Sequence, residues 1–132
     1  MITKEKEQLR AMKKILIVDD EPNIVMSLEY TFKKNNFEVF IARDGQEALD
    51  LLKTQSPDVI ILDVMMPMVD GFATLEQIKK NERLKNCKII FLSAKNKESD
   101  IEKGLSLGAN LYMTKPFSVK KLLEQVNELV KK

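Results

Sequence analysis

Three observations predict an α/β protein in which a parallel sheet is buried between two layers of helices. Short apolar runs of strand length alternate with segments whose apolar residues recur at helical spacing. Five runs and five such segments take turns along the chain, with no repeat or low-complexity stretch between them. The runs are almost continuously apolar, as strands are when helices cover both faces of their sheet. We therefore expect one doubly wound domain with five strands and five flanking helices.

The expected strands are residues 14–18, 37–42, 58–62, 88–92 and 110–113. Pro22 suits the first turn of a helix, Asp44 with Glu47 forms a cap-like pair, and Ser118 can cap the last helix. Gly108 is a typical helix end. The expected apolar faces of the helices are Ile24, Val25, Leu28 and Phe32; Ala48, Leu49 and Leu52; Phe72, Leu75 and Ile78; Ile101 and Leu105; and Val119, Leu122, Leu123, Val126, Leu129 and Val130.

Composition excludes several kinds of protein. The 132 residues suit one domain, and a net charge of +2 does not indicate a general polyanion-binding surface. No apolar run approaches the roughly 18 residues of a membrane span. Cys87 is the only cysteine, so no intrachain disulfide forms and we expect a reducing cytoplasm. The absence of histidine excludes Ser/His/Asp triads and the usual zinc sites.

The N-terminal residues are charged throughout and lack the apolar centre of a signal peptide. We expect residues 1–12 to be a polar lead-in and residues 13–132 to form the domain.

Polar side chains follow four of the five expected strands. They are Asp19 and Asp20 after the first strand, Asp63 after the third, Ser93 after the fourth, and Lys115 close after the fifth. The second strand ends at Arg43 without a comparable group, as expected of a strand at the edge of the sheet. Open α/β sheets bind ligands outside the carboxyl ends of their strands. The sequence therefore predicts one site at this edge.

The residue types at these strand ends indicate a particular chemistry. Two carboxylates about 4 Å apart repel each other by about 4 kcal/mol at an effective dielectric of about 20. A divalent cation relieves that repulsion, and an all-oxygen site favours Mg²⁺, or Mn²⁺, over zinc. Lys115 can pair with Asp63 or with a phosphoryl oxygen, and Ser93 adds a hydroxyl. This set suits phosphoryl transfer to or from a carboxylate.

Taken singly, each residue has a plainer interpretation. The two acids after the first strand can cap a helix, Asp63 and Ser93 can be turn residues, and Lys115 can be a solvated lysine. Met66 and Cys87 are expected to be packing residues. The combination of polar groups, all at strand ends on one side of one sheet, favours a reactive site.

Four motifs carry a resemblance to a known family. They are ILIVDDE (15–21), LDVMMPMVDG (62–71), FLSAK (91–95) and YMTKPF (112–117). In this order and spacing they resemble the receiver domain of two-component response regulators, of the single-domain kind typified by the chemotaxis response regulator. The resemblance covers residues 13 to about 131. It implies the flavodoxin-like doubly wound fold with strand order 2-1-3-4-5.

The resemblance implies roles for the acids and the lysine. Asp63 would accept a phosphoryl group from the phosphohistidine of a histidine kinase or phosphotransfer protein. Asp20, Asp63 and the main-chain carbonyl of Met65 would ligate Mg²⁺, with Asp19 holding a coordinated water. Lys115 would bind the phosphoryl group.

The resemblance also implies a conformational switch. Ser93 would move to bind a phosphoryl oxygen, Tyr112 would turn inward with it, and the bond between Lys115 and Pro116 would be cis. The surface that changes would be the fourth helix, fifth strand and fifth helix, residues 97–107, 111–113 and 118–130. An output protein or domain would bind there, and a phosphorylation-dependent homodimer is possible.

Met65 and Lys95 stand two residues after Asp63 and Ser93, at positions that tune hydrolysis in the family. We hypothesise that the thioether of Met65 hinders in-line attack by water and lengthens the life of the phosphoryl group.

Two other functions are alternatives to a phosphoacceptor. A phosphatase of the haloacid dehalogenase class places a second aspartate two residues after its nucleophile, where this chain has Met65; we therefore expect no turnover enzyme, only catalysis of its own phosphorylation and dephosphorylation. A receiver fold can also serve as an interaction module without phosphorylation, or be excised from a larger hybrid kinase or response regulator. The lysines of the last helix suit a solvated face, so no direct nucleic-acid or membrane partner is expected.

Overall fold

The computed structural model describes residues 12–131, so the predicted lead-in lies outside the described residues except for Met12. The strands are β1 (Lys13–Val18), β2 (Phe37–Ala42), β3 (Val59–Leu62), β4 (Lys88–Ser93) and β5 (Leu111–Thr114). The helices are α2 (Pro22–Lys34), α3 (Gly45–Leu51), α4 (Gly71–Lys79), α5 (Glu98–Ser106) and α6 (Val119–Val130), with a short 3-10 helix η1 (Glu82–Leu84). The predicted alternation of strands and helices is confirmed.

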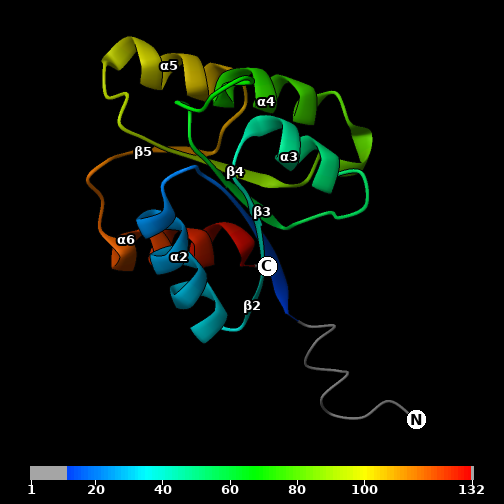
Figure 1. Ribbon diagram of the computed structural model, residues 1–132, viewed down its shortest axis with the longest axis vertical. Helices are drawn as coiled ribbons and strands as arrows, with labels where there is room; N and C mark the ends of the chain where they lie inside the picture. The colour runs from blue at the N-terminus through cyan, green and yellow to red at the C-terminus, as the bar shows by residue number, and fades with distance from the viewer. Residues whose placement is uncertain (1–11, 132) are drawn as a thin grey trace.

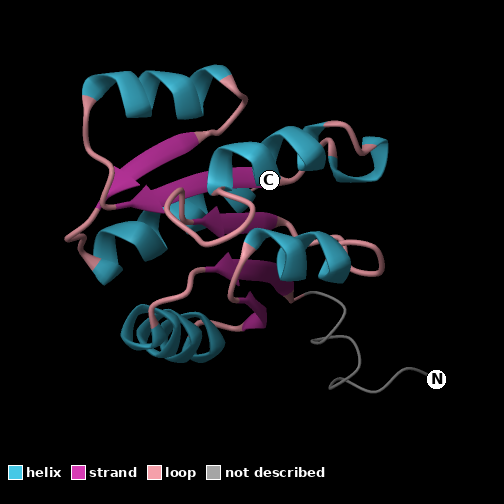
Figure 2. Cartoon of the chain, turned by 45° about the horizontal axis from the view of Figure 1, so that its top comes forward, coloured by secondary structure: helices cyan, strands magenta, loops and turns pink. Residues whose placement is uncertain are grey.

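The strands form one sheet in the order β2-β1-β3-β4-β5, and each neighbouring pair is parallel. This is the order that the resemblance implied, with β2 at an edge. Helices α3, α4 and α5 cover one face of the sheet, and α2 and α6 cover the other (Figure 1). The sheet is twisted between these layers (Figure 2), because each strand has a right-handed twist about its own axis.

Two apolar clusters form the core, one on each face of the sheet. Leu16, Ile60 and Phe91 point toward α3, α4 and α5. Their neighbours in sequence point the other way, and Ile61 and Leu92 pack with residues of α2 and α6. Successive side chains of a strand alternate between faces, so strands covered on both sides must be apolar at every position. This explains the continuous apolar runs.

Side chains cap several helices, at positions that include the predicted Asp44 and Ser118. The carboxylates of Asp44 and Asp70 accept hydrogen bonds from the backbone of the first turns of α3 and α4, and Ser118 does the same for α6. Gly108 follows α5 with φ of 110°, a backbone conformation that favours glycine. Each of these helices therefore begins or ends where the sequence indicated.

One apolar residue was misplaced by the helical pattern. Leu105 was expected on the buried face of α5, but 44% of its surface is exposed. The helix packs instead through its neighbour Gly104, which is buried. Because glycine has no side chain, the spacing of apolar residues did not reveal this contact.

Cys87 lies just before β4 and is buried, as expected of a packing residue. Burial raises the pKa of its thiol to about 12, so the reactive thiolate is scarce at neutral pH. Among the described residues, no helix combines the length and apolar character needed to cross a bilayer.

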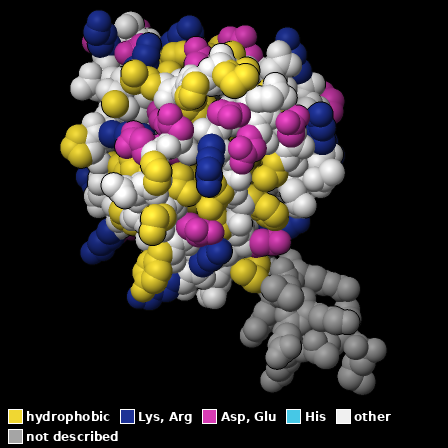
Figure 3. Space-filling view, viewed as in Figure 1, with side chains coloured by type: hydrophobic (Ala, Val, Ile, Leu, Met, Phe, Trp, Pro, Cys, Tyr) yellow, Lys and Arg dark blue, Asp and Glu magenta, His cyan; other side chains and the backbone are white. Residues whose placement is uncertain are grey.

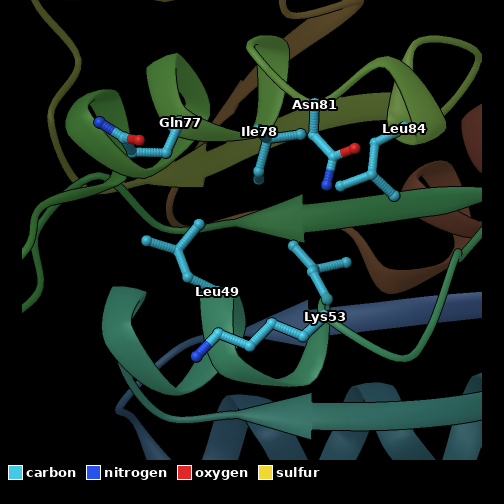
Figure 4. A pocket seen from close by; sticks show the side chains of 7 residues that line it. Leu49, Lys53, Gln77, Ile78, Asn81 and Leu84 are labelled. Carbon is cyan, nitrogen blue, oxygen red and sulfur yellow. The ribbon is translucent and has the colours of Figure 1, made fainter.

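A pocket lies between α3 and α4, toward their C-terminal ends (Figure 4). It is lined by Leu49, Leu52, Lys53, Gln77, Ile78, Asn81 and Leu84. Lys53 is the only charged residue of this lining, so the pocket has none of the carboxylate chemistry predicted at the strand ends.

Candidate functional site

The predicted site residues meet at the carboxyl edge of the sheet. β1 and β3 pair in register, so Asp19 and Asp63, which follow them, leave neighbouring strands at the same level. Ser93 ends β4 and pairs with the last residue of β5, and Lys115 follows directly. Asp19, Asp63 and Ser93 are buried, with 2%, 3% and 0% of their surfaces exposed. Buried polar groups need hydrogen-bond partners, and the surrounding residues supply them.

Asp63 is fixed through both of its carboxylate oxygens. Oδ1 accepts a hydrogen bond of 3.1 Å from the backbone N–H of Met65, and Oδ2 lies 3.4 Å from Nζ of Lys115. The first contact sets the orientation of the carboxylate, and the second supplies a positive charge at its other oxygen.

Asp19 does not cap the first helix. The N-cap of α2 is Glu21, whose side chain makes no capping hydrogen bond. Asp19 accepts a hydrogen bond of 2.9 Å from the backbone of Glu21 with Oδ1, and its Oδ2 accepts one of 3.0 Å from Lys115. The interpretation of Asp19 and Asp20 as helix caps is therefore wrong.

Lys115 lies among three carboxylates. Its Nζ is 3.0 Å from Asp19, 2.9 Å from Glu21 and 3.4 Å from Asp63. Burial disfavours the charged ammonium, but hydrogen bonds to these carboxylates and their negative charges outweigh it and raise the pKa of Lys115. Sequence reasoning missed Glu21 as a partner, although it directly follows the two aspartates at the end of β1.

We call Asp19, Asp20 and Asp63 the acid cluster, because one carboxylate oxygen of each lies within 4.8 Å of the others. Burial, and then the charge of Asp19, raise the pKa of Asp63, against the opposing effects of Lys115 and the Met65 N–H. One lysine does not neutralise three carboxylates. The all-oxygen donor set and this excess negative charge fit a hard divalent cation.

Ser93 and Tyr112 are connected through the backbone of Lys95. The Ser93 hydroxyl oxygen accepts a hydrogen bond of 3.2 Å from the N–H of Lys95. The Tyr112 hydroxyl donates one of 2.7 Å to the carbonyl of the same residue, and burial raises the pKa of that hydroxyl. The Tyr112 ring packs on Phe91 with centroids 5.7 Å apart. The two residues predicted as a switch pair thus both form hydrogen bonds with the backbone of Lys95.

Gly104 determines how closely α5 approaches this pair. A Cβ at Gly104 would lie 2.9 Å from ring carbons of both Phe91 and Tyr112, closer than van der Waals contact permits. Sequence reasoning missed Gly104, and the only available signal was a glycine in the middle of a helix, where it costs stability.

The loop between β3 and α4 follows Asp63 directly and carries Met65, Met66 and Met68. Met66 packs against the core, as expected, whereas Met65 and Met68 are 53% and 87% exposed. The loop is closed at its base, where Gly71 donates a backbone hydrogen bond of 3.0 Å to Val64. A Cβ at Gly71 would lie 2.2 Å from the carbonyl oxygen of Asp63, so only glycine allows this closure.

Two hollows flank the site. One is lined by Glu21, Ile24, Ala94, Lys115, Pro116 and Phe117, and the peptide bond between Lys115 and Pro116 is cis. The other is lined by Asp19, Asp20, Pro22, Val25, Met26, Glu29, Ile41 and Arg43. The acid cluster and its lysine are therefore reached from the surface on both sides of α2.

This constellation at the edge of a doubly wound sheet is what defines a receiver domain, and the chain belongs to that family. The family model described as the response regulator receiver domain matches residues 15–127. The alkaline phosphatase synthesis transcriptional regulatory protein PhoP of Bacillus subtilis (strain 168) is 42% identical over 120 residues, 91% of this chain and 49% of that protein. The chain thus spans about half the length of this relative.

Solved structures give the same result. The receiver domain of the Francisella response regulator 1452 is 38% identical, with a TM-score of 0.84 over 90% of this chain and 97% of that one. The receiver domain of a sensor histidine kinase from Pseudomonas aeruginosa PAO1, described with a magnesium ion coordinated in its active-site cleft, is 27% identical. Its TM-score is 0.83 over 92% of this chain and 99% of that one.

The raised pKa of Asp63 leads to a prediction for stability. The ionised carboxylate costs the folded state free energy, and this cost grows as pH rises from the unfolded pKa of about 3.9 through the higher folded pKa. We expect Asp63→Asn to be more stable than the unmodified chain at neutral pH without divalent ions, and to lose that advantage below the unfolded pKa. Each 1 kcal/mol gained corresponds to a rise in Tm of about 4 °C.

Urea denaturation at neutral and acidic pH measures this difference. Asp70→Asn is the matched control, because asparagine caps a helix as well as aspartate does. An Asp63→Asn protein that is less stable than the unmodified chain at neutral pH contradicts the prediction.

A methyl group at Gly104 should displace the Tyr112 ring. Overpacking costs about 1–3 kcal/mol, and the better helix propensity of alanine returns only about 1 kcal/mol. We expect Gly104→Ala to weaken the contacts between the ring protons of Tyr112 and Phe91 in NMR spectra, while the exposed Ser106→Ala leaves them unchanged. Unaltered ring contacts in Gly104→Ala would show that the helix shifts instead.

Proposed function

We propose that this chain is a phosphoacceptor in a two-component phosphorelay, in which Asp63 accepts a phosphoryl group from the phosphohistidine of a histidine kinase or phosphotransfer protein. The observation that carries the proposal is the environment of Asp63. Its carboxylate is buried and oriented by the Met65 N–H, with Lys115 and two further carboxylates beside it. Membership of the receiver family supports the same function.

In the transfer step, a carboxylate oxygen of Asp63 forms a bond to phosphorus as the bond from phosphorus to the histidine nitrogen breaks. Asp20, Asp63 and the Met65 carbonyl would hold Mg²⁺, or Mn²⁺, with Asp19 acting through a water. The cation would neutralise charge on the transferring oxygens. Catalysis of this kind is mostly positioning and charge neutralisation, so the chain would catalyse only its own phosphorylation and dephosphorylation.

Lys115 would exchange partners during the reaction. In the unphosphorylated chain its ammonium binds Asp19, Glu21 and Asp63. The contact to Asp63 is the longest of the three, so this oxygen is the one most easily given up. A phosphoryl oxygen would then take the place of the Asp63 carboxylate, while the other two acids keep the lysine at the site.

The new charge at Asp63 would bias the switch. Ser93 would leave the N–H of Lys95 to bind a phosphoryl oxygen, and the hydrogen bond that Tyr112 already makes to the carbonyl of Lys95 would hold its ring inward. This favours one of two existing conformations. The surface of α5, β5 and α6 would report the change to an output protein or domain, or to a second copy in a phosphorylation-dependent dimer.

The charge distribution on one face of the molecule fits a protein partner better than nucleic acid. Basic and acidic side chains are interspersed on the face shown in Figure 3, without a continuous basic stretch. We infer that the chain binds no DNA or membrane directly and works in the bacterial cytoplasm, with any output carried by a partner or by a domain attached to it in a longer protein.

Phosphorylation by a small phosphodonor tests the proposed function. The chain is incubated with Mg²⁺ and acetyl phosphate, and intact mass spectrometry measures the added phosphoryl group. We expect one group on the unmodified chain and on Asp70→Asn, and none on Asp63→Asn or without the divalent ion. No addition to the unmodified chain would favour an interaction module that works without phosphorylation.

Met65→Asn should lose its phosphoryl group faster. The exposed thioether at this position offers water no strong hydrogen bond, whereas an amide side chain orients a water molecule. One added hydrogen bond to the attacking water gives roughly a two- to tenfold faster loss. The rate is measured after removal of the donor, and a lifetime equal to that of the unmodified chain contradicts the hypothesis.

A further inference from the structure

Methionines account for most of the exposed large apolar side chains in the described part of the chain. The five such residues are Met26, Tyr30, Met65, Met68 and Leu105. Met26 lines a hollow together with two acids of the acid cluster, and the other two methionines belong to the β3–α4 loop. Met26 and Met65 thus border the site, and Met68 lies in the same loop as Met65. All three are too exposed for packing in the core to explain them.

An exposed thioether is a site for oxidation by a peroxide. The sulfur lone pair attacks one oxygen of the peroxide, the O–O bond breaks, and the second oxygen leaves as water or alcohol. Sulfur is oxidised by two electrons to the sulfoxide, and the peroxide is reduced. Exposure controls the rate, so Met65 and Met68, at 53% and 87% exposed, are accessible to this reaction.

Met65 differs from the other exposed methionines in its connection to the reacting group. Its backbone N–H donates a hydrogen bond to Oδ1 of Asp63, and the hydrogen bond from Gly71 to Val64 closes the loop that holds it. The backbone of Met65 is therefore held in a fixed position next to Asp63, and its side chain extends from that position. Met68 lies three residues further along with φ of 68° and has no such bond to the acid cluster.

We propose that Met65 is an oxidation site whose sulfoxide shortens the life of the phosphoryl group on Asp63. The inference rests on the proposed function, and it adds a peroxide as a second input at the same site. A thioether accepts hydrogen bonds weakly, whereas a sulfoxide oxygen accepts them strongly and can hold a water near phosphorus. That water attacks phosphorus, the bond to the Asp63 oxygen breaks, and a proton is released as inorganic phosphate leaves.

The experiment treats the purified chain with hydrogen peroxide, removes the peroxide, and maps sulfoxides by peptide mass spectrometry. The chain is then loaded with acetyl phosphate and Mg²⁺, and loss of the phosphoryl group is followed after removal of the donor. Each variant is compared with its own untreated sample. We expect a loss roughly two- to tenfold faster after oxidation, the range of one added hydrogen bond to the attacking water.

The matched variants are Met65→Leu and Met68→Leu, which replace one thioether each by a side chain of similar size that peroxide does not oxidise. Met68→Leu should keep the full effect of peroxide, and Met65→Leu should lose it. Treatment with methionine sulfoxide reductase and a thiol should restore the original lifetime.

Three results would overturn the inference: an unchanged lifetime when Met65 is oxidised, equal acceleration in Met65→Leu, or no Met65 sulfoxide when Met68 is converted. Failure of the proposed function gives a different result, because the untreated chain would then take up no phosphoryl group at all, and the inference would fall with it.

Discussion

The arrangement of the site depends on the contact between one buried lysine and several carboxylates. Asp19 and Asp63 are carried into the protein by the ends of two central strands, where the cost of burying like charges is large. Lys115, which follows the edge strand β5, offsets part of that cost through contacts of 3.0 and 3.4 Å. The remaining negative charge leaves the site suited to a cation and to an incoming phosphoryl group.

The rigid sheet supplies the precision that this chemistry needs. Parallel pairing of β1 with β3 fixes the level of the two aspartates, and the loop after β3 closes through Gly71, whose missing side chain lets the backbone approach Asp63. Two methionines of the closed loop, Met65 and Met68, are exposed to solvent. The same loop thus positions the reacting group and presents sulfur to solvent, which links the fold to the proposed sensitivity to peroxide.

A set of contacts leads from Ser93, at the same edge of the sheet as the acid cluster, toward α5 and β5. Ser93 and Tyr112 bind the N–H and the carbonyl of Lys95, and the tyrosine ring packs on Phe91 beneath Gly104. A change in the hydrogen bond of Ser93 therefore acts on Lys95, the residue whose carbonyl also holds Tyr112. This physical connection fits a two-state response, since packed aromatic rings have few alternative positions.

The sequence by itself determined the alternation of strands and helices and the polar residues that stand at the strand ends. Periodicity records which faces of each element are covered, and in a parallel sheet every strand end points to the same edge, so the acids, Ser93 and Lys115 were identified without coordinates. Only the tertiary structure decided that Glu21 completes the lysine's environment, that Gly104 packs where Leu105 was expected, and that Asp19 is buried while Asp20 is exposed. These depend on how helices pack against the sheet, and distances between elements are not encoded in the local spacing of apolar residues.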